Sequence, residues 1–137
     1  MRFMMIMFPP KSVETQGIPD DPKPFEEMGR YNEELMKAGV LLALDGLHPT
    51  SKGARVSVKN GKKQVVDGPF TEAKEIVGGY WIIQVRSREE ALEWASRVPL
   101  YDDGSFVELR QVFEISDFPP SVQKLDFHVR KALDKKA

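Results

Sequence analysis

The spacing of apolar residues predicts strands and helices in alternation along most of the chain. Residues 2–8 carry apolar side chains on both alternating faces, which predicts a first strand buried on two sides. Residues 9–22 are rich in Pro, Gly, Ser and Asp and predict a long loop. A helix is expected over residues 24–38, because Pro24 suits the first helical position and Gly39 supplies a stop.

A second strand over residues 40–47 is followed by a predicted tight hairpin. Asn60-Gly61 separates two alternating runs, residues 54–59 and 62–66, and this dipeptide favours a two-residue hairpin turn. We expect the hairpin to be an insertion at the edge of the sheet. The turn at residues 67–70 should then lead into a short helix over residues 72–77, which Thr71 would cap.

The second half of the chain repeats the order strand, helix, strand. Residues 80–87 predict a strand, Ser87 begins a capping box, and residues 105–115 predict the last strand. Two such halves predict an α+β fold, a ferredoxin-like antiparallel sheet with two helices on one face, over residues 1–117. Residues 118–137 add a C-terminal helical extension with apolar side chains on one side.

One face of this sheet has no predicted helix to cover it. Several strands carry apolar residues on both sides, so the second face requires a cover. A second copy of the chain would give a dimeric α+β barrel with cavities between or at the ends of the sheets. The C-terminal helix is the alternative cover, packed on its own chain or on its partner.

The composition restricts the classes of function. Hydrophobic residues make up 41% and charged residues 30% of 137, which is typical of one globular domain. A net charge of -1 disfavours direct binding to nucleic acid or to an anionic membrane. The chain has no cysteine, which fits a cytoplasmic location, and its apolar runs are too short for a membrane span.

Several separated motifs resemble one known family. The stretch DGPFTEAKEIVGGYWIIQV, then SREEALEWASRVP and a final VELRQVFE, are similar to the DGPF branch of the YCII-related family over roughly residues 1–115. The resemblance implies a ferredoxin-like dimeric α+β barrel and a small enzyme with a His-Asp pair in a cleft. It also implies an association with extracytoplasmic-function sigma factors. The histidine of YCII-type relatives lies in the first helix, and residues 24–38 contain none here.

His48 and Asp67 are the candidate catalytic residues. Both belong to the connection between the second and third core strands, which starts and finishes at the same end of the sheet. Imidazole titrates near about pH 6.5, and a carboxylate that fixes its tautomer suits it to acid–base catalysis. The structural alternatives are that Asp67 forms the turn through backbone hydrogen bonds and that His48 closes a strand.

Four further residues are candidates for ligand binding. Arg55 and Arg110 offer planar guanidinium groups for a carboxylate or phosphate, although surface ion pairing is the commoner use. Tyr80 and Trp81 alternate on one strand, so one should line the core and the other the second face of the sheet. The sequence contains no phosphate-binding loop and no metal-binding motif, so we expect no cofactor and no metal.

Three functions are consistent with these features. The first is a cofactor-free enzyme that uses His48 and Asp67 on a small molecule in a pocket at the end of the barrel. The second is a ligand-binding or regulatory module with the same pocket and no turnover. The third is a homodimeric scaffold in which the turn at residues 67–70 is purely architectural.

Overall fold

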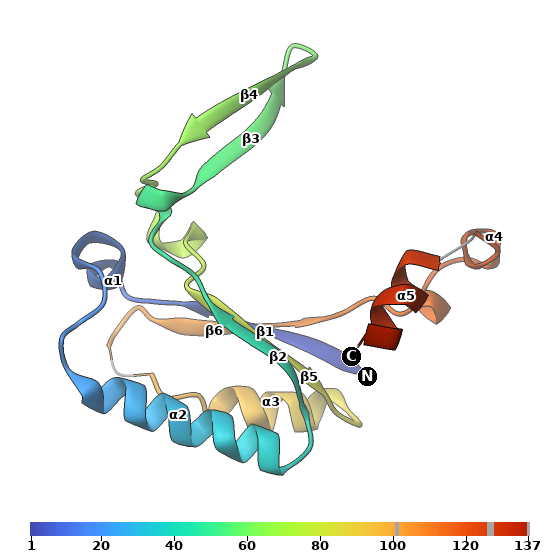
Figure 1. The fold of residues 1–137 in the computed structure, drawn as a ribbon, viewed down its shortest axis with the longest axis horizontal. Helices are drawn as coiled ribbons and strands as arrows, with labels where there is room; N and C mark the ends of the chain where they lie inside the picture. The colour runs from blue at the N-terminus through green and yellow to red at the C-terminus, as the bar shows by residue number, and fades with distance from the viewer. Residues whose placement is uncertain (101, 126–127, 137) are drawn as a thin grey trace.

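A four-stranded antiparallel sheet forms the centre of the protein (Figure 1). The computed structural model describes residues 1–100, 102–125 and 128–136. The sheet has the order β2-β5-β1-β6, so the first strand lies in the middle and the second strand neighbours the third core strand. This order confirms the predicted ferredoxin-like α+β fold. The strands are β1 (Arg2–Phe8), β2 (Leu41–Gly46), β5 (Gly79–Gln84) and β6 (Phe106–Gln111).

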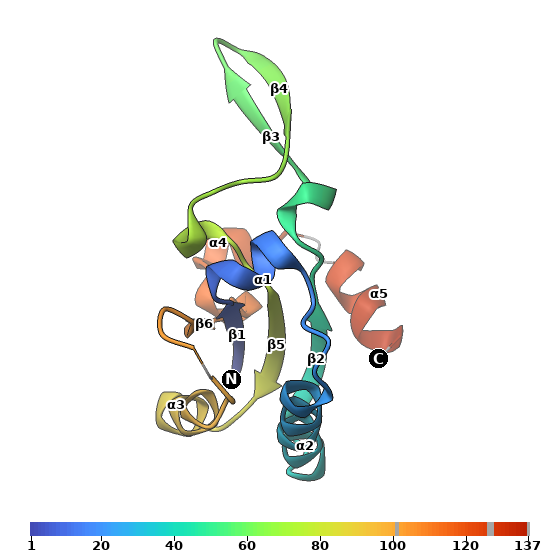
Figure 2. The same cartoon turned by 90° about the vertical axis from the view of Figure 1, so that its left-hand side faces the viewer.

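Two helices cover one face of the sheet, α2 (Pro22–Lys37) and α3 (Arg88–Ser96) (Figures 1 and 2). The Asp21 carboxylate caps α2 by accepting a hydrogen bond from the Lys23 N–H at 3.1 Å. The Ser87 hydroxyl caps α3 by accepting from the Glu90 N–H at 3.1 Å. Gly39 follows α2 with a φ of 74°, a left-handed conformation that glycine adopts without steric cost at the end of a helix.

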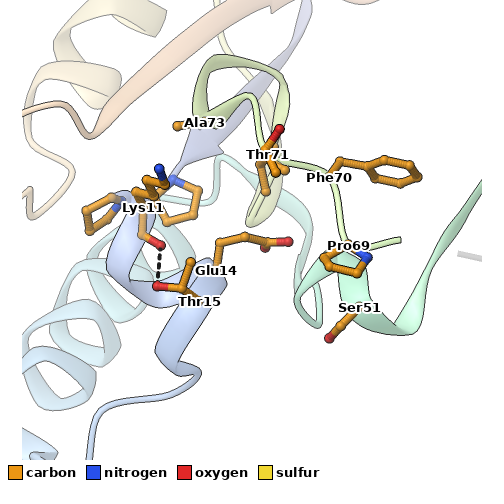
Figure 3. Close-up of a pocket in the computed structure, with 11 residues that line it drawn as sticks. Lys11, Glu14, Thr15, Ser51, Pro69, Phe70, Thr71 and Ala73 are labelled. Carbon is orange, nitrogen blue, oxygen red and sulfur yellow. Dashed lines mark hydrogen bonds between the residues drawn. The ribbon is translucent and has the colours of Figure 1, made fainter. Parts of the chain in front are cut away.

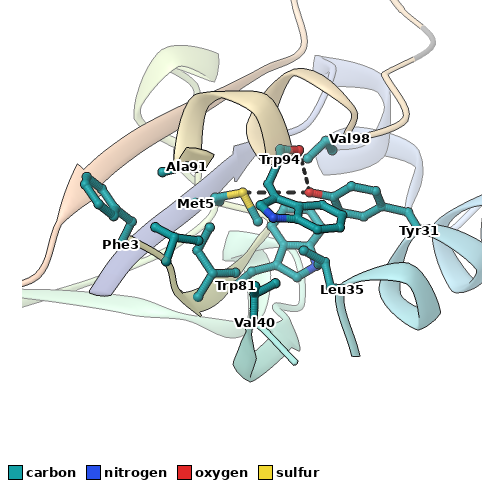
Figure 4. Packing of buried hydrophobic residues seen from close by; sticks show 11 residues of the cluster. Phe3, Met5, Tyr31, Leu35, Val40, Trp81, Ala91, Trp94 and Val98 are labelled. Atoms are coloured by element: carbon teal, nitrogen blue, oxygen red, sulfur yellow. Dashed lines mark hydrogen bonds between the residues drawn. The ribbon is translucent and has the colours of Figure 1, made fainter. Parts of the chain in front are cut away.

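The core lies between the sheet and these two helices (Figure 4). The Tyr31 hydroxyl donates to the Trp94 carbonyl oxygen at 2.7 Å, and burial raises the pKa of Tyr31. The Trp81 indole N–H donates to Asn32 Oδ1 at 2.8 Å. Leu35 is fully buried on α2, whereas Met36 is exposed although it fits the apolar spacing. The core cluster consists of Phe3, Met5, Tyr31, Leu35, Val40, Trp81, Ile83, Val85, Ala91, Trp94 and Val98.

The segment predicted as a loop contains a short helix, α1 (Lys11–Gln16). The prediction was wrong there, because Pro9 and Pro10 precede six residues that tolerate a helix and Gly17 ends it with a φ of 79°. No residue of α1 is buried, which explains why the apolar pattern gave no sign of it. The helix lies beside one end of the sheet (Figure 2).

The predicted hairpin is present but does not belong to the main sheet. Strands β3 (Ala54–Lys59) and β4 (Lys62–Asp67) form a separate two-stranded sheet, here called the arm. Its turn is the predicted Asn60-Gly61, with φ values of 53° and 76°. The arm rises from one end of the sheet on the side opposite to α2 and α3 (Figures 1 and 2). The hairpin is inserted after β2, an edge strand of the main sheet, but it forms a sheet of its own and does not extend that edge.

Within the described part of the chain, the second face of the main sheet carries no layer comparable to α2 and α3. The strand register places alternate residues of all four strands on this uncovered face. Apolar and charged side chains are mixed there, and Phe106 is 37% exposed. The residues that the register places on the uncovered face are Arg2, Met4, Ile6, Phe8, Ala43, Asp45, Tyr80, Ile82, Gln84, Phe106, Glu108 and Arg110.

The C-terminal extension lies on the side of the uncovered face, at the end away from the arm (Figure 1). It contains η3 (Ile115–Asp117), α4 (Pro120–Gln123) and α5 (His128–Lys136). A groove of about 900 Å³ separates α5 from the sheet, and Leu133 on the wall of that groove is 51% exposed. The extension therefore does not seal the sheet. Among the described residues, no helix has both the length and the apolar character needed to cross a membrane.

Candidate functional site

The candidate site is built around the corner, residues 67–70, where the arm returns to the sheet. The Gly68 N–H donates to the Gly53 carbonyl oxygen at 3.0 Å, and the Gly68-Pro69 peptide bond is cis. A Cβ atom on Gly68 would collide with the Thr50 carbonyl oxygen. Glycine is therefore required at Gly68 by the close approach of another backbone segment.

Close approach also explains the double glycine after the corner. A Cβ on Gly78 would lie 2.8 Å from the Pro9 ring, and a Cβ on Gly79 would lie 2.9 Å from the Asp45 carbonyl oxygen. The short helix predicted between the corner and this pair is only a 3₁₀ turn, η2 (Ala73–Glu75). Its N-cap residue is Glu72, whose side chain makes no capping hydrogen bond, so the predicted capping role of Thr71 was wrong.

A chain of hydrogen bonds joins α1 to the corner through a second 3₁₀ turn, η1 (Thr50–Lys52). Glu14 Oε1 accepts from the Thr50 backbone N–H at 2.8 Å and also from the Thr50 hydroxyl. The same hydroxyl oxygen accepts from the Phe70 N–H at 2.9 Å. Thr50 therefore links the Glu14 carboxylate to the backbone of the corner.

Two hollows lie on either side of the Glu14 side chain. The first, the corner hollow, has a volume of about 330 Å³, and Lys11, Glu14, Thr15, Ser51 and Thr71 supply its polar groups. Figure 3 shows the Glu14 side chain reaching from α1 towards Pro69 and Thr71. The remaining walls are apolar and consist of Pro9, Pro10, Pro69, Phe70, Ala73 and Ile76.

The second hollow, the histidine hollow, also measures about 330 Å³ and contains His48. It shares Pro9, Glu14 and Ile76 with the corner hollow, so the two spaces adjoin. A carboxylate and an imidazole thus line one mostly apolar cavity, an arrangement that suits proton transfer to a bound molecule.

The predicted partner of His48 lies elsewhere in the connection. Asp67 ends β4 opposite Ala54, and the described residues that line the two hollows do not include it. The pairing of His48 with Asp67 stays a prediction. The described carboxylate that lines the histidine hollow is Glu14.

The four predicted ligand-binding residues do not gather at one place. The Arg55 guanidinium lies 3.8 Å from the centre of the Phe70 ring and 3.6 Å from a Glu75 carboxylate oxygen. Arg110 lies on the uncovered face, with Glu108 Oε2 at 3.4 Å. The predicted use of Arg110 for a ligand stays a prediction, and its described contact is this exposed ion pair.

Tyr80 and Trp81 point to opposite faces of the sheet, as the alternation predicts. Trp81 belongs to the core, and the Tyr80 hydroxyl donates to Asp45 Oδ2 at 3.0 Å. This hydrogen bond, with the negative charge of Asp45, raises the pKa of Tyr80. Both aromatic residues line a hollow of about 180 Å³ at the end of the sheet where the histidine hollow lies.

Sequence reasoning did not identify Glu14 and Thr50. Glu14 lies in the segment predicted as a loop, and its hydrogen-bond partner is 36 positions away in the chain. Two prolines followed by residues that tolerate a helix were the available sign of α1. Within the described residues, no group of three or more His, Asp or Glu side chains is placed to hold a metal ion.

Comparison with known proteins identifies the family. The chain is 32% identical over 76 residues to an uncharacterised protein of Rhizobium meliloti (strain 1021), and this match covers 56% of the chain. It spans 61% of the length of that relative. The family model of the YCII-related domain matches residues 1–116, from β1 to the start of the C-terminal extension. The chain therefore belongs to the family of YCII-related domain proteins.

Proposed function

We propose that the protein binds a small molecule in the paired hollows around Glu14 and acts on it by proton transfer. The observation that carries this proposal is that Glu14 and His48 line the same hollow, while Glu14 also lines the adjoining one. A molecule that enters either space meets the carboxylate. The two hollows together offer a volume in the range of small-molecule sites.

The surroundings favour a ligand with an apolar body and a few polar groups. Prolines, Phe70 and Ile76 supply apolar walls, and hydroxyl groups with the Lys11 ammonium supply donors at the rim. Thr50 holds Glu14 Oε1 in place by two hydrogen bonds. Pre-positioned groups of this kind bind with less loss of side-chain freedom than mobile ones.

The roles of the two acid–base candidates follow from their chemistry. A carboxylate accepts a proton or a hydrogen bond, and a neutral imidazole can both accept and donate. In this proposal Glu14 orients the ligand, His48 exchanges the proton, and Asp67 remains the sequence-based candidate partner of His48. The turn Asp67-Gly68-Pro69-Phe70 supports placement in the DGPF branch of the family.

The test is a fragment screen followed by two-dimensional NMR. A panel of aromatic and aliphatic hydroxy, amide and carboxylate compounds is added to the ¹⁵N-labelled protein. We expect hits to shift the amide signals of residues 11–15, 48–51 and 69–73. Glu14→Gln and His48→Asn should abolish those shifts, whereas Glu89→Gln, an exposed change on α3, should leave them unchanged.

Turnover is followed for every hit by NMR of the small molecule itself. Conversion that is lost in His48→Asn supports the enzyme. Loss of conversion in Asp67→Asn would also support the predicted pairing of His48 with Asp67. Binding without conversion favours the ligand-binding module. A panel that leaves the amides around Glu14 and His48 unshifted contradicts the proposed site and favours the scaffold.

We also propose that the protein is a homodimer in which the uncovered faces of two sheets meet. The support is the set of apolar side chains on that face, including Met4, Ile6 and Ile82, which lie on the two central strands. Apolar residues in the middle of a sheet are rarely left to water. The oligomeric state over a range of concentrations tests this pairing independently of the fragment screen.

A further inference from the structure

The arm is unusual because it packs against nothing within its own described chain except at its base. Every residue of β3 and β4 is exposed. An isolated two-stranded hairpin is at best marginally stable in water and gains stability by packing against another surface. A partner surface for the arm is therefore expected.

The two faces of the arm differ in character. Cross-strand pairing places Val56 opposite Val65 and Ser57 opposite Gln64. Because paired residues share a face and successive residues alternate, Val56, Val58 and Val65 lie together on one face, with Lys63 opposite Val58. These valines are 64%, 67% and 68% exposed. The arm thus presents an apolar strip on one side and a mostly polar surface on the other.

The base of the arm is anchored to the corner. The Arg55 guanidinium lies 3.8 Å from the centre of the Phe70 ring and 3.6 Å from Glu75 Oε2. These contacts hold the start of β3, at the base of the arm, against the corner and η2. The arm therefore projects in a defined direction, on the side of the uncovered face (Figures 1 and 2).

The charge of the arm is opposite to that of the rest of the chain. Residues 54–67 contain four basic side chains and one acidic side chain, a net charge of +3. The whole chain carries -1, so the other residues together carry -4. Arg55, Lys59 and Lys62 lie on the face opposite to the valines, so this charge acts on the approach of two copies and lies outside the apolar contact. Two arms repel each other, whereas an arm is attracted to the body of another copy.

The dimensions also match. A six-residue antiparallel strand is about 20 Å long, and the outer strands of a four-stranded sheet are about 15 Å apart. The arm is therefore long enough to cross the full width of a main sheet. In the proposed dimer the partner's sheet covers Met4, Ile6 and Ile82, so the arm would meet the border of the uncovered face, where the edge strands β2 and β6 carry the exposed Leu42 and Phe106.

We propose that the arm of one copy docks on the body of a second copy, with the strip of Val56, Val58 and Val65 against the border of the uncovered face. The inference rests on the proposed homodimer and goes beyond it. It assigns the hairpin the role of a clamp that reaches across the interface, in addition to the contact between the two sheets. Each copy gives one arm and receives one, as twofold symmetry requires.

The first experiment compares two double variants that differ only in the face they alter. Val56→Glu with Val65→Lys places a cross-strand ion pair on the apolar strip, and Ser57→Glu with Gln64→Lys places the same pair on the other face. Neither changes the net charge, and opposite charges across the strands support the hairpin in both. Circular dichroism confirms that each variant is folded.

The dimer dissociation constant is measured by sedimentation equilibrium. We expect the variant of the apolar strip to weaken association by about tenfold or more, and the control to change it by less than about threefold. Salt should weaken the wild-type dimer, because the attraction between arm and body is screened. Equal effects of the two double variants would overturn the docking of the strip.

The second experiment leaves the apolar strip intact. Because the chain contains no cysteine, Asn60→Cys gives a single site for a spin label at the tip of the arm. Labelled, unenriched protein is mixed with unlabelled ¹⁵N-enriched protein, so that paramagnetic broadening reports only contacts between copies. We expect broadening of amides on the body of the enriched copy, near the uncovered face.

The outcomes separate this inference from the proposed pairing. A monomer at every concentration overturns both. A dimer with no broadening between copies, or with broadening confined to the partner's arm, overturns the clamp and leaves the contact between sheets standing. Broadening of the body together with the selective loss of affinity supports the clamp.

Discussion

Replacing Thr50 with valine tests whether the hydrogen bonds around Glu14 hold the candidate site together. Thr50→Val keeps the branched shape of the side chain but removes the hydroxyl that bonds to Glu14 and to the Phe70 N–H. A hydrogen bond to a charged group contributes about 1.5–3 kcal/mol and one between neutral groups about 1 kcal/mol. Glu14 keeps its bond from the Thr50 backbone N–H, and the site is only partly buried.

We therefore expect the free energy of unfolding to fall by about 2.5 kcal/mol, the lower end of the sum of the two hydrogen bonds. For a domain of this size that loss corresponds to a decrease of roughly 8 °C in Tm. Urea unfolding followed by the fluorescence of the two buried tryptophans, Trp81 and Trp94, measures it. Thr50→Ser, which retains the hydroxyl, should recover most of the stability.

Thr15→Val is the matched control. Its hydroxyl also lies at the corner hollow, but it donates only to the Lys11 and Ser12 carbonyl oxygens of its own helix, at 3.2 and 3.4 Å. We expect a change within about 0.5 kcal/mol, as for most exposed sites. If the two valine variants lose the same stability, Thr50 does not join α1 to the corner and the reasoning fails.

Three further predictions concern the corner, the core and the C-terminal extension. Gly68→Ala should lower the free energy of unfolding by about 1–3 kcal/mol through overpacking, whereas Gly46→Ala, with no atom within 4 Å of the added carbon, should have little effect in the same urea assay. Leu35→Ala should cost about 3 kcal/mol, because it empties a fully buried position; a loss below about 1 kcal/mol would contradict that packing. The hydrogen bond and charge of Arg2 lower the pKa of Glu114 below its ordinary 4.5. The pair of Arg2 and Glu114 therefore stabilises the folded protein fully above that pH, and this stabilisation is lost as the pH falls and the carboxylate is protonated. Glu114→Gln should then narrow the difference in Tm between pH 6 and pH 3, and an unchanged difference would contradict this assignment.

The main sheet and its two helices were predictable because local signals and the overall fold agree. The proline at the start of α2 is Pro22, two residues before the expected Pro24. This proline, Ser87 at the start of α3 and the Asn60-Gly61 turn each act through nearby backbone atoms. The alternation of apolar residues in β1 correctly indicated two apolar faces. Such features can be read from a window of a few residues.

The arm and the candidate site depend on contacts that no short window contains. Alternating valines look the same in a strand that packs against a sheet and in one that projects from it, so the detachment of β3 and β4 could not be read from the pattern. Glu14 acquires its place only when Thr50 lies beside it. His48 was identified because histidine is rare in this chain and chemically versatile, while a single glutamate among many carried no such signal.

The lack of any buried side chain on α1 has a consequence for how the hollows open. This helix forms a wall of both spaces, yet its link to the rest of the protein depends on Glu14 and on its flanking residues. A swing of α1 would enlarge the two hollows together without exposing the core. Its amide hydrogens should accordingly exchange with solvent sooner than those of β1 and β5, and an occupant bridging the hollows would slow that exchange.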